Sequence, residues 1–113
     1  MKLLYKNKKV EDICTNEKKA IKELGTEVAT KLYMVLNLLK SAKNLKDILA
    51  FPQYKLHVLK GNLDGIYSMY LGKKTGFRLL LIPLDENENK IKRVDMEFYV
   101  IAVCVEIVEV SNC

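Results

Sequence analysis

The only histidine of the chain, His57, lies between two lysines in the segment KLHVLKG, residues 55–61. An imidazole titrates near neutral pH, and ammonium groups on either side favour an anion beside it. This combination suits a site that handles a polyanion. The structural alternative is a half-buried strand histidine whose ring nitrogens bond to backbone carbonyls, and His57 taken alone favours that alternative.

A second candidate for chemistry is Arg78, which lies in the apolar run GFRLLLIP, residues 76–83. In a strand, alternate side chains point to opposite faces, so Arg78 shares its face with Leu80 and Ile82. A guanidinium among aliphatic side chains is costly to bury alone. We expect either a ligand beside Arg78 or, with equal weight, a salt bridge to one of three acids: Glu97, Glu106 or Glu109.

Other familiar chemical motifs are missing from the sequence. Cys14, Cys104 and Cys113 form no CxxC pattern and have no histidine pair near them, so neither a disulfide framework nor a zinc site is expected. The sequence also contains no phosphate-binding glycine loop and no convincing nucleophile triad. We therefore expect no metal and no cofactor. We expect Tyr54, Tyr67 and Tyr70 to serve in packing, although aromatic rings beside cations also suit base stacking.

The composition is that of a soluble globular protein forming a single domain over residues 1–113. Half of the residues are hydrophobic, 29% are charged, and the net charge of +5 favours an anionic partner. The longest apolar run, FYVIAVCV at 98–105, is too short to span a membrane, which takes about 20 residues. The N-terminal segment lacks the pattern of a secretory signal. A cytoplasmic protein without membrane contact is the expectation.

The first half of the chain has helical patterns. A short strand at 3–7 is followed by helical residues that end at Gly25, with a break at Thr15 or Asn16. Apolar residues then recur at intervals of three and four, which predicts an amphipathic helix from Thr26, as its N-cap, to about Ser41. A further helical turn is expected over 44–49.

The second half has strand patterns. The runs at 54–61, 65–72 and 76–83 are rich in branched and aromatic residues and are separated by turn residues, which predicts two hairpins. A polar loop follows at 85–90, and then one long central strand at 96–110. This order predicts an α+β fold in which N-terminal helices pack on one face of a small, mostly antiparallel sheet.

The segment YKLHVLKGNLDGIYSMYLGKKTGFRLLL, residues 54–81, resembles the core of HigB-like toxins in the RelE/ParE superfamily of type II toxin-antitoxin systems. A pattern of the form YKLHxLKGxxxGxWS followed by an aromatic residue and an arginine is typical of that group. The residues of this chain that match it in place are Tyr54, Lys55, Leu56, His57, Leu59, Lys60, Gly61, Gly65, Ser68 and Arg78. The order of helices and strands is also similar over about two thirds of the chain.

The resemblance implies a RelE-like fold and a toxin that enters the ribosome and cuts messenger RNA without a metal, as an mRNA interferase. In that chemistry the ribose 2′-OH attacks the adjacent phosphate. The expected catalytic residues are His57, Lys60 and Arg78, and the expected RNA-binding residues are Lys55, Lys73 and Lys74. The implied partners are messenger RNA, the ribosome and a cognate antitoxin, through which alone the toxin reaches operator DNA.

Two alternatives remain open within this resemblance. Such toxins commonly end their last strand with an acid, a tyrosine and a histidine, whereas this sequence reads VEVSNC. A catalytically impaired homologue that binds an antitoxin or RNA is therefore the main alternative. A gyrase inhibitor of the ParE branch is the other, and the match to KLHxLKG argues against it.

Overall fold

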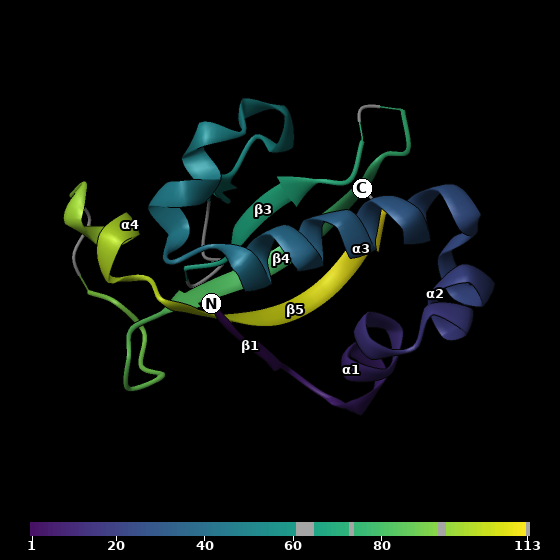
Figure 1. Cartoon of the computed structure of the whole chain (residues 1–113), viewed down its shortest axis with the longest axis horizontal. Helices are drawn as coiled ribbons and strands as arrows, with labels where there is room; N and C mark the ends of the chain where they lie inside the picture. The colour runs from purple at the N-terminus through teal and green to yellow at the C-terminus, as the bar shows by residue number, and fades with distance from the viewer. Residues whose placement is uncertain (61–64, 73, 93–94, 113) are drawn as a thin grey trace.

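A computed structural model of the chain describes residues 1–60, 65–72, 74–92 and 95–112, and Figure 1 traces their path. Helices fill most of the first half of the chain and strands most of the second, which is an α+β arrangement. The helices are α1 (Lys8–Thr15), α2 (Glu17–Leu24), α3 (Thr26–Ser41), the 3-10 helices η1 (Leu45–Ala50) and η2 (Pro52–Tyr54), and α4 (Glu97–Ile101). The strands are β1 (Lys2–Tyr5), β2 (His57–Val58), β3 (Tyr67–Tyr70), β4 (Phe77–Leu84) and β5 (Cys104–Asn112).

The described strands form one sheet in the order β1-β5-β4-β3-β2. β1 runs parallel to β5, and the other neighbours pair antiparallel, so the predicted α+β class with a mostly antiparallel sheet is confirmed. β5 lies between β1 and β4, which agrees with the central position predicted for the last strand. The two predicted hairpins are present as β2-β3 and β3-β4.

Two asparagines divide the N-terminal helices. The side chain of Asn7 accepts a hydrogen bond from the Val10 amide at the start of α1. Asn16 ends α1 and then caps α2, where its side chain accepts from the Lys19 amide, so the predicted break is confirmed. The predicted N-cap of α3 is wrong by one residue. Gly25, with φ of +86°, holds that position, and Thr26 is already helical.

α3 provides the apolar face that covers the sheet. Figure 1 shows this helix lying across β4 and β5. Its buried side chains meet buried side chains of the sheet in one core, which includes Leu32, Val35, Leu36, Leu39, Met69, Leu79, Leu81, Val105 and Ile107. α3 has 16 residues, and within the described ranges no helix combines the length and apolar character needed to cross a bilayer.

Two predicted strands are shorter than expected. The run at 54–61 contributes only His57 and Val58, because η2 ends at Tyr54 and Lys55 takes a left-handed conformation with φ of 48°. The strand predicted at 96–110 begins at Cys104, because Glu97–Ile101 forms α4. Met96 is the N-cap of α4 and gives no side-chain cap bond, while the Asp95 side chain just before it accepts a bond from the Glu97 amide. Phe98 stacks on Tyr67 with ring centres 5.3 Å apart. A turn at Asp95 and an aromatic contact thus accompany the departure from the strand pattern.

Candidate functional site around Tyr70

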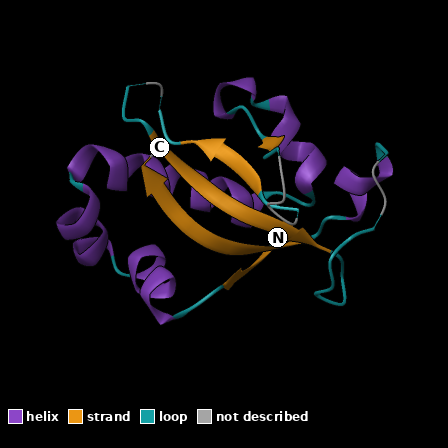
Figure 2. Ribbon diagram, turned by 180° about the vertical axis from the view of Figure 1, so that it is seen from behind, coloured by secondary structure: helices purple, strands orange, loops and turns teal. Residues whose placement is uncertain are grey.

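Strand register places the predicted site residues on one face of the sheet. Tyr70 pairs with Arg78 across β3 and β4, and Arg78 pairs with Ser111 across β4 and β5. His57 pairs with Ser68, which is two residues before Tyr70 on β3. Directly opposite residues point to the same side of a sheet, as do residues two apart on one strand. These side chains therefore lie on the face opposite α3, and Figure 2 views the sheet from that side.

The Tyr70 ring is contacted by three of the residues that sequence reasoning selected. The Lys55 Nζ lies 5.4 Å from the ring centre and the Arg78 Cζ lies 5.7 Å from it. The His57 ring meets the same ring edge-on, with centres 6.4 Å apart and planes at 74°. Both cation distances are within the range of a favourable cation–π interaction. We call Lys55, His57, Tyr70 and Arg78 the Tyr70 cluster.

The backbone fixes the orientation of the His57 ring. Its Nδ1 lies 2.6 Å from the Lys55 carbonyl oxygen. A carbonyl only accepts hydrogen bonds, so Nδ1 carries the proton in this contact. In the neutral ring Nε2 then holds the lone pair, and His57 is exposed to solvent. The imidazole is thus positioned to accept a proton from a bound molecule.

The Arg78 guanidinium forms no ion pair among the described residues, whose salt bridges join Lys2 to Glu88, and both Lys8 and Lys19 to Asp12. The expected alternative of a bridge to Glu97, Glu106 or Glu109 is therefore not found in the described part of the chain. Arg78 is half-buried and in contact with the Tyr70 ring, which keeps it on the exposed face. Its planar fork of donors remains available to a phosphate or carboxylate.

The remaining predicted lysines are not joined to the cluster. Lys60 is exposed and follows Leu59, whose amide donates to the Ile66 carbonyl. Within the described residues Lys60 makes no ring contact or ion pair with the Tyr70 cluster. Lys74 is exposed at the turn between β3 and β4. Lys73 lies outside the described residues, as do Gly61 and Cys113. The structure thus assembles Lys55, His57 and Arg78 but not Lys60.

Sequence reasoning did not single out Tyr70 from the other tyrosines. Tyr67 and Tyr70 are three residues apart on β3, so they point to opposite faces. Tyr67 stacks on Phe98, and burial raises its pKa to about 12. Tyr67 is therefore a packing residue, as predicted, whereas Tyr70 contacts the cations. The odd spacing of the two tyrosines in the sequence indicates that they point to opposite faces of the strand and so have different roles.

Glu109 is a second residue that sequence reasoning could not place. β5 carries an irregularity in register, because Leu80 pairs with Glu109 while its neighbour Leu81 pairs with Ile107. The extra residue resets the alternation, so Glu106 and Glu109 point to the same face although they are three apart. Glu109 is exposed and pairs with Leu80, two residues along β4 from Arg78 and on the same face. A carboxylate thus borders the cluster, and no sequence pattern reveals such a bulge.

No protein-family model matches the sequence, and searches of curated proteins and of solved structures find no significant match. The geometry of the Tyr70 cluster and the local resemblance of residues 54–81 therefore carry the functional interpretation. A half-buried ring bordered by two cations and an oriented imidazole suits a phosphate attached to an aromatic base.

Proposed function

We propose that this protein is a HigB-like toxin that cuts messenger RNA on the ribosome without a metal, and that a cognate antitoxin neutralises it. The Tyr70 cluster is the observation that supports this proposal most, because it joins two cations and a proton acceptor on one exposed sheet face. The sheet, with α3 across its other face, is also compatible with a RelE-like arrangement of N-terminal helices on one side.

The proposed chemistry uses the side chains as they lie. The Nε2 of His57 accepts the proton of a ribose 2′-OH, and the 2′ oxygen forms a bond to the adjacent phosphorus. The bond from phosphorus to the 5′ oxygen breaks, that oxygen takes a proton from water, and the hydroxide that remains takes the proton from His57. The products are a 2′,3′-cyclic phosphate and a free 5′-OH. Arg78 stabilises the negative charge on the equatorial oxygens, while Lys55 attracts the phosphate.

A noncatalytic binding protein is the second candidate, and the end of β5 favours it. Ser111 lies directly opposite Arg78, and Asn112 lies opposite Phe77. Neither a hydroxyl nor an amide exchanges a proton readily near neutral pH. Because His57 is the only histidine of the chain, the cluster has one group suited to proton transfer and no evident second. A homologue that binds RNA or an antitoxin without cutting would need no second group for proton transfer.

Controlled expression with mapping of transcript ends separates these functions. We expect growth arrest and translation-dependent cuts at fixed codon positions, with 5′-OH ends. Chromosomal DNA damage without such cuts would indicate a gyrase inhibitor instead. Arrest or RNA binding without either effect would indicate the binding protein.

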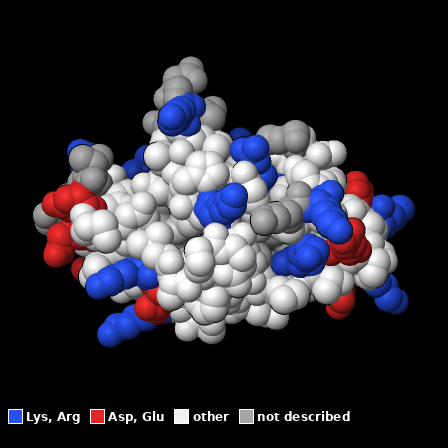
Figure 3. All heavy atoms as spheres, turned by 90° about the horizontal axis from the view of Figure 1, so that it is seen from above, with Lys and Arg blue, Asp and Glu red and all other residues white. Residues whose placement is uncertain are grey.

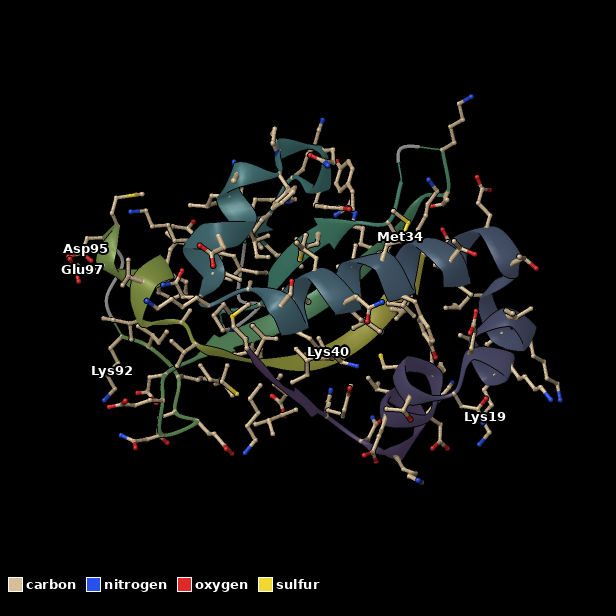
Figure 4. The ribbon with its side chains drawn as sticks, viewed as in Figure 1. Lys19, Met34, Lys40, Lys92, Asp95 and Glu97 are labelled. Atoms are coloured by element: carbon tan, nitrogen blue, oxygen red, sulfur yellow. The ribbon has the colours of Figure 1, made fainter. Side chains whose placement is uncertain are left out.

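Arg78→Ala should reduce cutting by about 10²-fold or more, since loss of one electrostatic stabiliser of the transition state commonly has that effect. Lys40→Ala removes a positive charge from an exposed position on α3 and serves as the matched control; Figure 4 labels Lys40 on this helix. Circular dichroism and urea unfolding verify that both variants fold. A folded Arg78→Ala variant that cuts as fast as the wild type would rule out the assigned role.

A further inference from the structure

A pocket of ≈ 360 Å³ lies beside the Tyr70 cluster, between α3, η2 and the residues that follow β3. Its volume is within the range of small-ligand sites. Met34 and Leu71 supply apolar wall, and Gln53 and Tyr54 supply an amide and a phenol. Figure 4 shows Met34 projecting from α3 on the side where η2 and the β3–β4 turn lie.

Lys55 belongs to both the pocket and the cluster. It lines the pocket, while its Nζ lies 5.4 Å from the centre of the Tyr70 ring. Its left-handed backbone, with φ of 48°, comes directly after η2 and lets the chain turn from the pocket wall into β2. A phosphate held by Lys55 would therefore place an attached group at the mouth of the pocket.

A second cation, Lys31, also lines the pocket, and its side chain lies in space that a side chain at position 72 would fill. A Cβ on Gly72 would lie 2.7 Å from the Lys31 Cδ and 2.9 Å from its Cε, closer than real contacts allow unless the lysine side chain moves. The backbone of Gly72, with φ of +96°, also disfavours other residues. Glycine at this position thus lets the Lys31 stem lie against the backbone with its ammonium at the pocket.

The pocket combines an exposed apolar surface with positive charge. Met34 is 58% exposed, which leaves its thioether uncovered on an otherwise amphipathic helix. Among the described residues that line the pocket there are two lysines and no carboxylate. Figure 3, viewed from above, shows basic side chains across the middle of this side and acidic ones nearer its two ends. A flat, polarisable group that carries an anion satisfies both properties better than a hydrocarbon or a bare inorganic anion.

We propose that this pocket binds an unpaired nucleobase of a phosphorylated ribonucleotide. The base lies against Met34, Gln53 bonds to its edge, and Lys55 contacts the phosphate. The thioether and aliphatic wall favour a base over a sugar, because aromatic faces interact well with sulfur. The choice of RNA as the source of the nucleotide rests on the function proposed above, and a free nucleotide would offer the same chemistry.

Nuclear magnetic resonance of protein with ¹³C-labelled methionine methyl groups tests the pocket directly. Met34 reports on the pocket, and Met96, 65% exposed near α4, is the internal control. We expect the Met34 signal to shift saturably with nucleoside 5′-monophosphates and with an RNA trinucleotide in which one 2′-deoxyribose replaces the attacking ribose to prevent cutting, while Met96 stays unchanged. A Met34 shift with ribose 5-phosphate as large as with the nucleotides, or no shift at millimolar nucleotide, would overturn the proposal. A stronger response to the trinucleotide than to the monophosphates identifies RNA as the source; the reverse identifies a free nucleotide.

A pair of charge variants on α3 sharpens this test. Met34→Glu places a carboxylate in the pocket and should weaken nucleotide binding at least about tenfold, which corresponds to 1.4 kcal/mol. Asn37→Glu introduces the same charge three residues further along the helix, at an exposed position that does not line the pocket. Asn37→Glu should leave the affinity for the nucleotide within about twofold of that of the wild type. Equal weakening by both variants would show general charge repulsion and would reject the base pocket.

The two proposals fail in different ways. Codon-positioned cuts in the wild type, with no Met34 response to nucleotides, would reject the base pocket and leave the nuclease intact. A nucleotide-dependent Met34 shift without any transcript cutting would support the pocket and reject the nuclease. If both hold, Gln53→Ala should change the base preferred at the cut sites more than it changes the total rate of cutting.

Discussion

The guanidinium carbon of Arg78 lies 5.7 Å from the centre of the Tyr70 ring, and the two residues are directly paired across β3 and β4. This pairing keeps the cation on the exposed face without a carboxylate partner among the described residues. It also limits the positions that the guanidinium takes, because the ring occupies one side of it. Tyr70 thus acts as a support for the cations and as a surface on which a base can stack.

Replacing the ring should reveal this double role. Tyr70→Phe keeps the aromatic face and should retain RNA affinity within about threefold, whereas Tyr70→Ala should lose roughly tenfold or more, since stacking on an aromatic side chain is worth about 1–3 kcal/mol per base. Binding of a labelled single-stranded RNA measures both. An equal loss in Tyr70→Phe would assign the effect to the hydroxyl instead of the ring.

Lys55 and Lys60 provide a direct comparison between structure and sequence. The pattern of residues 55–61 predicts a catalytic Lys60, whereas the structure joins Lys55 to the cluster. Lys55→Gln should weaken RNA binding and lower the slope of log affinity against log salt by about 0.7, the change expected for one lost phosphate contact on a single strand.

Lys60→Gln is the matched variant, since it removes the same charge from an exposed position five residues away. We expect it to change the salt slope by less than half as much. Titrations of single-stranded RNA at several salt concentrations measure both slopes. A larger effect of Lys60→Gln would favour the sequence-based assignment and would place the phosphate nearer the end of β2.

Local patterns predicted the parts of the fold that depend on neighbouring residues. The break at Asn16, the amphipathic face of α3 and the alternation of β4 follow from capping and from side-chain periodicity. The face of Arg78 could be predicted for the same reason, since Leu79 and Leu81, one and three residues after it on β4, are fully buried on the other face. The residue partners on that face could not, because strand order and register arise from contacts distant in sequence.

The errors have a common physical origin. The run at 98–105 is apolar enough for a strand, yet its first part is helical, with the Asp95 side chain accepting from the Glu97 amide before it and Phe98 packed on Tyr67. The segment at 54–61 is a strand for only two residues because Lys55 is left-handed. In the first place a tertiary aromatic contact competes with the strand propensity of the residues, and in the second a left-handed residue interrupts the strand. The bulge that brings Glu109 beside the site also depends on pairing with β4, which no local pattern encodes.

Asn16 should be important for stability because one residue serves two helices. Its backbone ends α1, and its side chain accepts from the Lys19 amide at the start of α2. Asn16→Ala should lower the free energy of unfolding by about 1 kcal/mol, the usual value of an N-cap. Asn37→Ala, at an exposed position within α3, is the control and should be neutral or slightly stabilising. Urea unfolding measures the free energy of unfolding of both variants, and equal destabilisation by the two substitutions would contradict the capping role of Asn16.

The Cys14 thiol should make the protein less stable in alkali. It is 3% exposed, and burial raises its pKa from 9.0 to about 11. Between these values the unfolded chain loses the thiol proton and the folded chain keeps it, so the free energy of unfolding falls as pH rises, by up to roughly 2 kcal/mol. Below pH 9 the contribution of the Cys14 thiol to the free energy of unfolding is nearly constant. Cys14→Ala should therefore show a shallower decline than the wild type in urea unfolding between pH 8 and 10.5. Parallel declines would show that Cys14 ionises alike in both states.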